Sequence, residues 1–350
     1  MTIKVLIVDD SALIRSLLSE IVKSAKGMFL VGAAPDAYVA RDLVNKFSPD
    51  VITLDIEMPK VDGLTFLEKL MKAHPTPVLM ISTLTEQGVN ATLRALELGA
   101  IDYIAKPKLG VAQGIEEYRQ LIIDKIRIAA TSKVKPVTKQ KSANTATLNY
   151  SGTEKIIAVG ASTGGTEAIK EFLIDLPSNS PGVVITQHMP PGFTTSYAKR
   201  LDTLCKINVI EAKGGERILP GNAYLAPGSY HLLIERSGAD YRLQLADTPL
   251  VSGHKPSVDV MFNSLSQCAA KNTVAVILTG MGKDGAAGMF SLYQQGAYTL
   301  AQDKASCVVF GMPKEAINLG GVGKVLPLNA MAGAVIKHLH SANAGSRLKF

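Results

Sequence analysis

The sequence has few cysteines and no long apolar run, and each shortage excludes a class of protein. Its three cysteines, Cys205, Cys268 and Cys307, are scattered without metal-ligand spacing, so neither a disulfide framework nor a zinc site is expected. No apolar run approaches the roughly 18 residues of a membrane span, and the start "MTIKVLIVDD" reaches an acidic pair too early for a signal sequence. We therefore expect a cytoplasmic protein that does not insert directly into a membrane.

The positive charge is concentrated in one short segment of the 350 residues. The formal net charge is +7, yet residues 1–125 hold 14 basic and 16 acidic residues, whereas residues 126–141 hold five basic residues and no acidic one. The stretch "TSKVKPVTKQKSANTATLNYSGTEK" is nearly free of large apolar residues, as solvated linkers are. We therefore predict two domains, residues 1–125 and 153–350, joined by a basic polar linker over residues 126–152.

Nothing in the second domain resembles a nucleic-acid reader. It has no helix-turn-helix pattern and no interleaving of aromatic and basic residues. We expect no nucleic-acid partner.

Apolar runs alternate with amphipathic stretches throughout the first domain. "KVLIVDD", "PDVITLDIEMP", "PVLMIST" and "DYIAKP" are typical of strands, and "SALIRSLLSEIVKSA" or "GLTFLEKLMKA" between them has helical spacing. This rhythm predicts a doubly wound parallel sheet, in which ligands bind at the carboxyl ends of the strands.

Polar side chains stand at those strand ends. Each of four predicted strands ends in one or two of them: Asp9 and Asp10, Asp55, Ser82, and Lys106. One such aspartate alone would be read as a turn former or a helix cap. Carboxylates that converge repel one another, and a hard cation such as Mg²⁺ relieves the repulsion, while a lysine can pair with a phosphoryl group.

These residues resemble the receiver domain of bacterial response regulators. "VDDSALIR", "LDIEMPKVDG" and "AKP" stand where that family has its acidic pair, its phosphorylated aspartate and its lysine. The resemblance implies a flavodoxin-like fold in which Asp55 accepts phosphate from a histidine kinase. It also implies that Asp10, Asp55 and the carbonyl of Glu57 hold Mg²⁺, and that Ser82 and Tyr103 are the switch hydroxyl and switch aromatic beside Lys106.

The strand and helix rhythm resumes after the linker. "KIIAVG", "GVVITQ", "TVAVILTG" and "AYTLAQ" are typical of parallel strands. Between the second and third of them, "GNAYLAPGSYHLLIERSGADYRLQLAD" has short β-rich runs separated by glycine turns, which favours a hairpin insertion. We predict a second, Rossmann-like α/β domain with this insertion.

The glycine-rich stretch "IIAVGASTGG" can present either a phosphate cradle or a nucleophile. It fails the dinucleotide fingerprint G-x-G-x-x-G because Ser162 replaces the second glycine. It fits G-x-S-x-G, in which a serine occupies a sharp turn between a strand and a helix. About 20 residues on, a dinucleotide binder needs an acid for the ribose, but the next strand ends in His188.

Serine, histidine and aspartate end three predicted strands of the second domain. Asp284 in "TGMGKDG" follows the third strand, so His188 could take the proton of Ser162 while Asp284 orients the imidazole. Asp303 competes with Asp284, and His231 and His254 are weaker rivals of His188 for the role of base. His338 and His340 fall on a predicted C-terminal helix, where no catalytic role is expected.

"GASTGGTEAI", "ITQHMPPGFT", "KPSVDV" and "VILTGMGKDGAAGM" resemble the CheB family of chemotaxis protein-glutamate methylesterases, and the similarity runs from end to end. The resemblance implies a hydrolase that demethylates glutamyl γ-methyl esters, and deamidates glutamines, on the cytoplasmic helices of chemoreceptors. Ser162, His188 and Asp284 match the family's triad; Thr163 flanks the nucleophile, and the backbone N–H of Met281 matches its oxyanion donor. No cofactor is expected for hydrolysis.

Two other readings stay open at this point. A response regulator with a non-catalytic binding domain would hydrolyse no methyl ester, and a nucleotide-dependent oxidoreductase would need an acid near position 188. If the unphosphorylated first domain obstructs the second, phosphorylation of Asp55 would release it.

Overall fold

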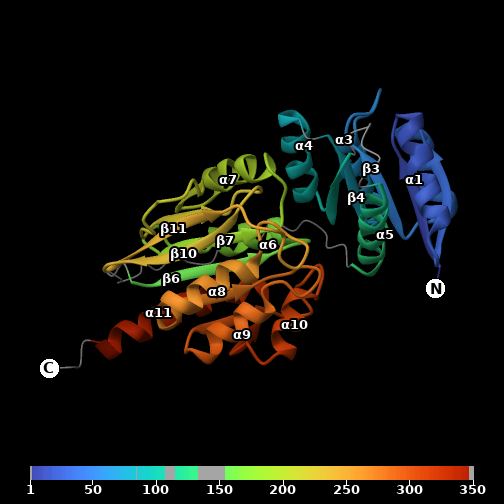
Figure 1. The fold of residues 1–350 in the computed structure, drawn as a ribbon. Helices are drawn as coiled ribbons and strands as arrows, with labels where there is room; N and C mark the ends of the chain where they lie inside the picture. The colour runs from blue at the N-terminus through green and yellow to red at the C-terminus, as the bar shows by residue number, and fades with distance from the viewer. Residues whose placement is uncertain (1, 84, 107–114, 133–153, 347–350) are drawn as a thin grey trace. The chain divides into compact units, whose positions relative to one another are not determined.

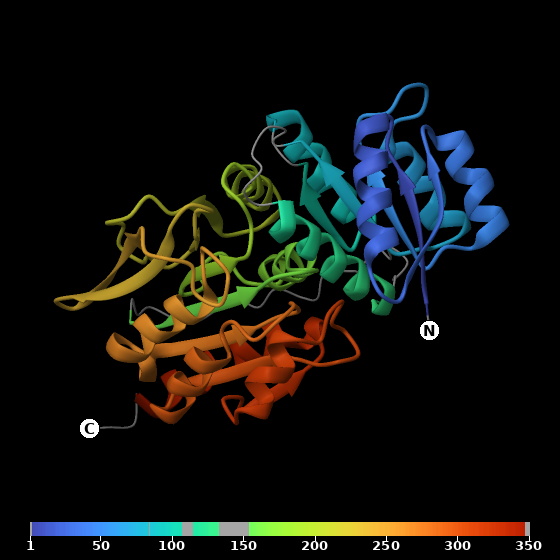
Figure 2. The same cartoon turned by 45° about the vertical axis from the view of Figure 1, so that its right-hand side comes forward.

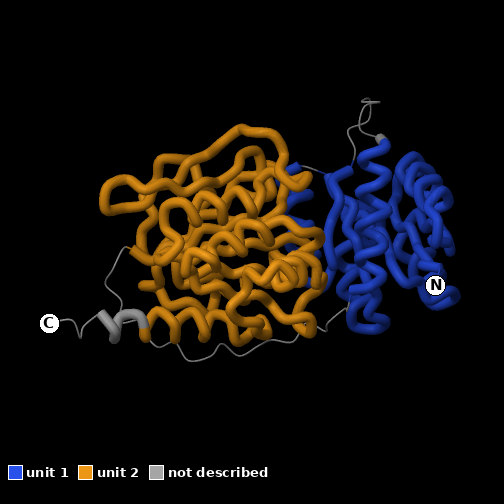
Figure 3. Tube along the Cα trace, turned by 60° about the horizontal axis from the view of Figure 1, so that its bottom comes forward, with its two compact units in different colours: residues 1–139 blue, residues 140–350 orange. Residues whose placement is uncertain are grey.

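The chain forms two compact units, residues 1–139 and 140–350, shown in different colours in Figure 3. This computed structural model describes residues 2–83, 85–106, 115–132 and 154–346. Each unit is an α/β domain with its own parallel sheet, which confirms the predicted fold class (Figure 1).

The first unit alternates strands and helices without interruption. Its elements are β1 (Ile3–Val8), α1 (Ala12–Ser24), β2 (Met28–Ala34), α2 (Ala37–Phe47), β3 (Val51–Asp55), α3 (Gly63–Ala73), β4 (Val78–Ser82), α4 (Glu86–Glu97), β5 (Asp102–Ala105) and α5 (Ile115–Thr131).

The sheet of the first unit has the strand order β2-β1-β3-β4-β5, and all its pairs are parallel. This is the flavodoxin-like order. Strand β2 was not among the predicted strands, because it lies at the edge and its residues are mostly half-exposed. N-cap side chains such as Asp36 of α2 and Asp62 of α3 accept hydrogen bonds from backbone N–H groups of the first helical turn. These bonds fix where the helices begin.

Helix α5 continues past the predicted end of the first domain. It runs to Thr131, six residues beyond residue 125, because Ile126 and Ala129 lie on its buried face. Most of the predicted linker, residues 133–152, falls outside the described residues.

The second unit has more strands than the sequence predicts. Its elements are β6 (Ile156–Ala161), α6 (Gly165–Ile174), β7 (Gly182–Gln187), α7 (Phe193–Leu204), β8 (Asn208–Glu211), β9 (Asn222–Leu225), β10 (His231–Ser237), β11 (Asp240–Ala246), α8 (Val258–Cys268), the 3₁₀ turn η1 (Ala270–Asn272), β12 (Thr273–Ile277), α9 (Ala286–Gln294), β13 (Tyr298–Gln302), α10 (Met312–Asn318), β14 (Lys324–Leu326) and α11 (Leu328–Ser346).

Seven of these strands form one parallel sheet in the order β14-β13-β12-β6-β7-β9-β8. The chain winds outward in both directions from β6 and β12, so crossovers of the usual right hand place α6 and α7 on one face and α9 and α10 on the other. Helix α11 packs against α6, and α8 packs against α9.

The antiparallel hairpin is smaller than predicted. It comprises only β10 and β11, which pair from His231–Ala246 to Ser237–Asp240. The run "NAYL" at its predicted start is β9, a parallel strand of the main sheet inserted between β7 and β8. Figures 1 and 2 show the hairpin beside α8, against which β10 packs.

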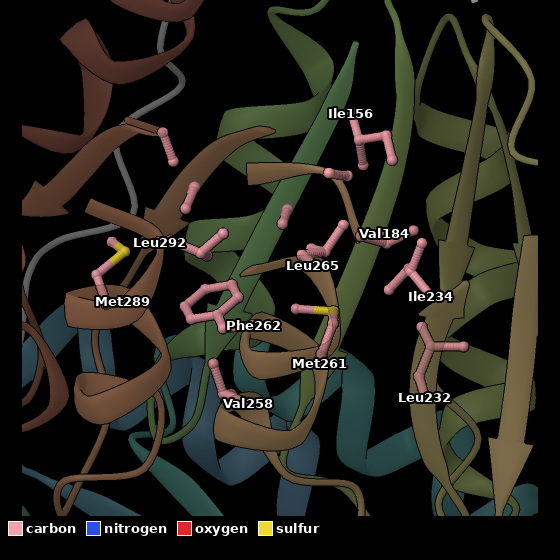
Figure 4. Packing of buried hydrophobic residues seen from close by; sticks show 14 of the residues in the cluster. Ile156, Val184, Leu232, Ile234, Val258, Met261, Phe262, Leu265, Met289 and Leu292 are labelled. Carbon is pink, nitrogen blue, oxygen red and sulfur yellow. The ribbon is translucent and has the colours of Figure 1, made fainter. Parts of the chain in front are cut away.

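The core on this side of the second sheet is centred on α8. Val258, Met261, Phe262 and Leu265 are fully buried and belong to one cluster with residues of β6, β7 and β10, as Figure 4 shows. The burial of four large side chains fixes α8, whose N-terminal turn lies at the site described next.

Among the described residues, no helix combines the length and apolarity needed to cross a bilayer.

Candidate active site

The sheet topology places three predicted residues at one edge of the second unit. Ser162, His188 and Asp284 follow β6, β7 and β12, whose carboxyl ends are neighbours because the three strands are adjacent and parallel. The chain leaves β6 and β12 in opposite directions, so this edge is the switch point at which open α/β sheets bind ligands.

Ser162 occupies a sharp turn between β6 and α6. The N–H of Gly165 donates to the Ser162 carbonyl over 2.7 Å, and the Ser162 N–H donates to the Thr279 carbonyl over 3.0 Å. The side chain is half-exposed, as a nucleophile on such a turn must be.

The glycines around Ser162 serve packing. Gly164 has φ +76°, a conformation that favours glycine, and a Cβ at Gly165 would lie 2.1 Å from the Gln187 Oε1 and 2.7 Å from the Ala161 Cβ. Gly160 abuts Val258 of α8 in the same way. The loop is therefore explained without a phosphate ligand, which removes the main support for the nucleotide-binding reading.

His188 and Asp284 form a buried hydrogen-bonded pair. The His188 Nε2 lies 2.7 Å from the Asp284 Oδ2, and the two side chains are 7% and 1% exposed. Because the carboxylate only accepts, Nε2 carries the proton in the neutral ring. The Nδ1 is buried and meets no hydrogen-bond partner among the described residues, so it is the nitrogen left to accept a proton.

Asp284 is held ionised by donors from the first turn of α8. The Ser257 Oγ and the N–H groups of Val258 and Asp259 donate to it over 2.7, 2.7 and 3.1 Å. Burial alone would raise the pKa of this carboxyl, but the hydrogen bond and charge of His188, followed by Ser257 and Val258, outweigh burial and lower the pKa to about 2.

The loop after β12 lies directly against Ser162. A Cβ at Gly280 would be 2.8 Å from the Ser162 Cβ, and the Gly280 carbonyl accepts from Gly311 and Met312. The next residue, Met281, is 39% exposed, and within the described part of the chain its backbone N–H donates to no acceptor. Thr163 is buried, and its carbonyl accepts from the Thr279 hydroxyl over 3.0 Å.

The rival residues occupy other positions. Asp303 accepts from the N–H and hydroxyl of Ser306, and so it shapes its own turn. His338 and His340 lie on α11, as predicted. His231 is fully buried at the start of β10, and both of its ring nitrogens bond to backbone atoms.

His254 contacts His188, the candidate catalytic base. Its ring stacks on that of His188 with centroids 3.6 Å apart and planes 15° from parallel. It therefore covers one face of the imidazole, a contact that the sequence analysis did not predict. The contact of Ser257 with Asp284 was also missed, although "PSVDV" carries a signal for it: a serine before an apolar run is a typical helix N-cap.

The first unit brings together the carboxylates predicted at its strand ends. Asp9, Asp10 and Asp55 each offer an oxygen within 4.8 Å of the others. The Lys106 Nζ lies 2.7 Å from the Asp55 Oδ2 and 3.2 Å from the Asp9 Oδ2. Burial, joined by the charge of Asp9, outweighs Lys106 and raises the pKa of Asp55 to about 6. Glu57 is exposed two residues after β3.

The two switch candidates are both buried in the first unit. The Ser82 Oγ lies 2.6 Å from the Thr92 Oγ1 and 3.2 Å from the Gly88 carbonyl, so it is bonded to α4. The Tyr103 side chain is 8% exposed, and burial raises the pKa of its phenol well above the usual range.

Comparison with known proteins decides the family. A family model described as CheB methylesterase matches residues 157–335, and one described as response regulator receiver domain matches residues 5–112. The protein-glutamate methylesterase/protein-glutamine glutaminase of Methylobacillus flagellatus is 58% identical over 357 aligned positions, covering 100% of both chains. The chain belongs to this methylesterase family. A second relative of this name, numbered 2, from Pseudomonas aeruginosa is 56% identical over 99% of this chain and 100% of its own.

A solved structure extends the match to the fold of the methylesterase domain. The catalytic domain of Thermotoga maritima CheB methylesterase superposes with a TM-score of 0.52 and 39% identity, covering 53% of this chain and 100% of that one.

Proposed function

We propose that this chain hydrolyses glutamyl γ-methyl esters, and deamidates glutamines, on the cytoplasmic domains of methylated chemoreceptors. The proposal rests on membership of the methylesterase family together with one observation: the buried His188–Asp284 pair lies at the same sheet edge as Ser162. It places the protein in the cytoplasm and assigns the catalytic roles to these three residues.

The chemistry is acyl transfer through a serine ester. The Ser162 Oγ bonds to the ester carbonyl carbon while its proton passes to the His188 Nδ1, the ring nitrogen that Asp284 leaves free. The C–O bond to the methoxy group then breaks, and the same proton leaves with methanol. A water molecule then attacks the acyl-enzyme carbonyl carbon while its proton passes to His188. The bond to the Ser162 Oγ breaks, Ser162 recovers that proton, and the glutamate is released. A glutamine substrate releases ammonia in place of methanol.

The loop after β12 would stabilise the oxyanion. The first candidate donor is the backbone N–H of Met281, which follows Gly280, the residue packed against Ser162. The second is the backbone N–H of Thr163, the residue after the nucleophile. Such donors are fixed before the reaction, and each contributes roughly 3 kcal/mol in related enzymes.

Asp55 is the proposed phosphorylation site, with a histidine kinase as donor. The residues fit Mg²⁺, because the donor set is three carboxylates that each offer an oxygen within 4.8 Å of the others. Asp10, Asp55 and the carbonyl of Glu57 would hold the ion, which when bound neutralises the charge of the carboxylates and the phosphoryl group. Lys106 is placed to pair with a phosphoryl oxygen on Asp55.

The switch would start from Ser82. Its hydroxyl must leave Thr92 to follow a new phosphoryl group, which would loosen the start of α4. Tyr103, the proposed switch aromatic, is already buried in this structure, so the switch would not require its ring to move from solvent into the interior.

Methanol release from methylated receptor fragments tests the enzyme. We expect Ser162→Ala to abolish release, whereas Ser178→Ala, which removes an exposed hydroxyl of the same domain, should leave it unchanged. A folded Ser162→Ala variant that releases methanol at the wild-type rate would remove Ser162 from its role. If the wild-type protein released none, a non-catalytic output domain would be favoured instead.

A further inference from the structure

His231 connects a distant hairpin to the catalytic candidates through a loop. Its ring is fully buried, Nε2 lies 3.0 Å from the Pro249 carbonyl, and Nδ1 lies 3.1 Å from the Ser257 N–H. A carbonyl only accepts and a backbone N–H only donates, so Nε2 carries the proton and Nδ1 is the acceptor. One imidazole in one tautomer thus binds both ends of the loop formed by residues 249–257.

Two parts of this loop, its end and its middle, contact the catalytic pair. At its end, Ser257 caps α8 and donates its hydroxyl to the Asp284 Oδ1 over 2.7 Å. In its middle, Val251 and His254 exchange two backbone hydrogen bonds, and the resulting turn stacks His254 on His188. The loop therefore contacts His188 directly through one ring and indirectly through the carboxylate that orients it.

We propose that His231 and Ser257 are positioning residues for hydrolysis: His231 closes the loop of residues 249–257, and Ser257 transmits that constraint to Asp284 and so to the ring of His188. The proposal rests on the hydrolase function proposed above. A buried histidine that merely stabilises the hairpin would affect unfolding but not the geometry of the catalytic pair.

The pattern of hydrogen bonds supports the positioning role. Asp284 is 1% exposed and accepts three bonds from the first turn of α8, so a small rotation of that turn moves the carboxylate with it. The His231–Ser257 bond is the only side-chain bond to the N–H of that N-cap among the residues described. Misplacing a catalytic group by about 1 Å can cost about 100-fold in rate, so a loosened turn is expected to lower kcat rather than substrate binding.

Two substitutions at position 231 distinguish the effect of the hydrogen-bond acceptor for the Ser257 N–H from the effect of the bulk of the ring. The Oδ1 of His231→Asn occupies nearly the place of Nδ1 and can still accept the Ser257 N–H, whereas His231→Leu has similar bulk and no acceptor. We expect His231→Leu to lower kcat for methanol release about ten-fold or more, with KM within about two-fold. His231→Asn keeps the acceptor for the Ser257 N–H but loses the donor to the Pro249 carbonyl, so it should restore part of kcat.

A second pair of variants lies on α8. Ser257→Ala removes the hydroxyl that donates to Asp284 and should also lower kcat about ten-fold. Ser264→Ala is its control: Ser264 is also buried on α8 and accepts the Ile234 N–H of β10, but it does not contact Asp284. We expect Ser264→Ala to lower the stability while leaving kcat within about two-fold of the wild type.

A spectroscopic readout reports on the pair without turnover. The proton between the His188 Nε2 and the Asp284 Oδ2 should give a far-downfield resonance in the folded wild-type chain, and its assignment follows from its loss in His188→Gln. We expect this resonance to broaden or shift in His231→Leu and Ser257→Ala and to persist in Ser264→Ala.

Several outcomes would overturn the proposal. Wild-type kcat and an unchanged resonance in folded His231→Leu would do so, as would His231→Asn behaving no better than His231→Leu, since the acceptor would then not matter. An equal fall of kcat in Ser264→Ala would assign the effect to general packing of the hairpin. Should His231→Leu not fold, Ser257→Ala against Ser264→Ala decides alone. Absence of methanol release from the wild type refutes the proposed function, and the resonance still tests the coupling.

Discussion

Replacing Asp284 by Asn should damage both the catalytic pair and the stability of the second unit. The Oδ1 of the carboxylate accepts hydrogen bonds from the Ser257 hydroxyl and the Asp259 N–H. The Oδ2 accepts from the Val258 N–H and the His188 Nε2–H. An asparagine has one oxygen and one NH₂ group, so in either orientation a backbone N–H of α8 faces a donor instead of an acceptor. A buried donor without a partner costs about 1–3 kcal/mol.

The tautomer of His188 makes the same substitution a test of mechanism. If the NH₂ group faces Nε2, that nitrogen must accept, and the ring proton moves to Nδ1, the atom that has to take the serine proton. If the oxygen faces Nε2, the ring keeps its tautomer but loses the negative charge that stabilises the imidazolium. We expect methanol release to fall on the order of 10³- to 10⁴-fold, as in related triads.

The pH dependence of stability has a defined sign. The folded pKa of Asp284 is about 2, against 3.8 for an unperturbed aspartate, so the ionised carboxylate stabilises the fold by about 2 kcal/mol at neutral pH. Because the folded pKa is the lower one, this stabilisation is complete above pH 3.8 and is lost as pH falls towards 2. The Asp284→Asn variant has no carboxylate to ionise, so the difference in unfolding free energy from the wild type should be full at pH 7 and 5 and shrink below pH 4.

Urea unfolding of both proteins at pH 7, 5, 4 and 3, followed by circular dichroism, measures that gap. A gap that stayed constant down to pH 3, or equal stability at pH 7, would refute the assignment of an ionised Asp284 held by α8. Wild-type methanol release by the folded variant would refute its role in orienting His188.

Other predictions follow from single features of the two units. Gly165→Ala would place a Cβ 2.1 Å from the Gln187 Oε1, so urea unfolding should show a loss of about 1–3 kcal/mol; unchanged stability would contradict the close packing of the serine turn. Removing Mg²⁺ with EDTA should abolish any stimulation of methanol release by a small-molecule phosphodonor without changing the basal rate, and a fall in the basal rate would implicate a metal in hydrolysis. Deleting residues 1–139 should raise the basal rate under the obstruction hypothesis, which an unchanged rate would contradict.

The sequence predicts most clearly the elements that are buried on both faces. Strands such as β6 and β7 are continuous apolar runs because helices cover both sides of a parallel sheet, and they are the strands that carry Ser162 and His188. The strands that escaped prediction, β2, β8 and β14, are short or half-exposed. Strand β9 was predicted only as part of the hairpin, and no helix connects β8 to β9. These segments form strands because they pair with strands elsewhere in the chain, and the hydrophobic periodicity of a single segment does not reveal such pairing.

The inner support of the site is a tertiary feature. Ser257 is visible in the sequence as a helix cap, but its second bond, to Asp284, joins residues 27 positions apart. The same holds for His254, whose ring meets His188 only because a turn folds back. Which nitrogen of His188 faces Asp284 depends on the side-chain orientation, so the assignment of Nδ1 as the proton acceptor required the structure.

Methanol release from methylated receptor fragments, with and without a small-molecule phosphodonor and Mg²⁺, tests the central claim most directly. The account predicts release that rises with the phosphodonor in the wild type, a basal rate without that rise in Asp55→Asn, and no release in Ser162→Ala under either condition. Wild-type release that the phosphodonor leaves unchanged would contradict control through Asp55, and no release in either state would contradict the hydrolase itself.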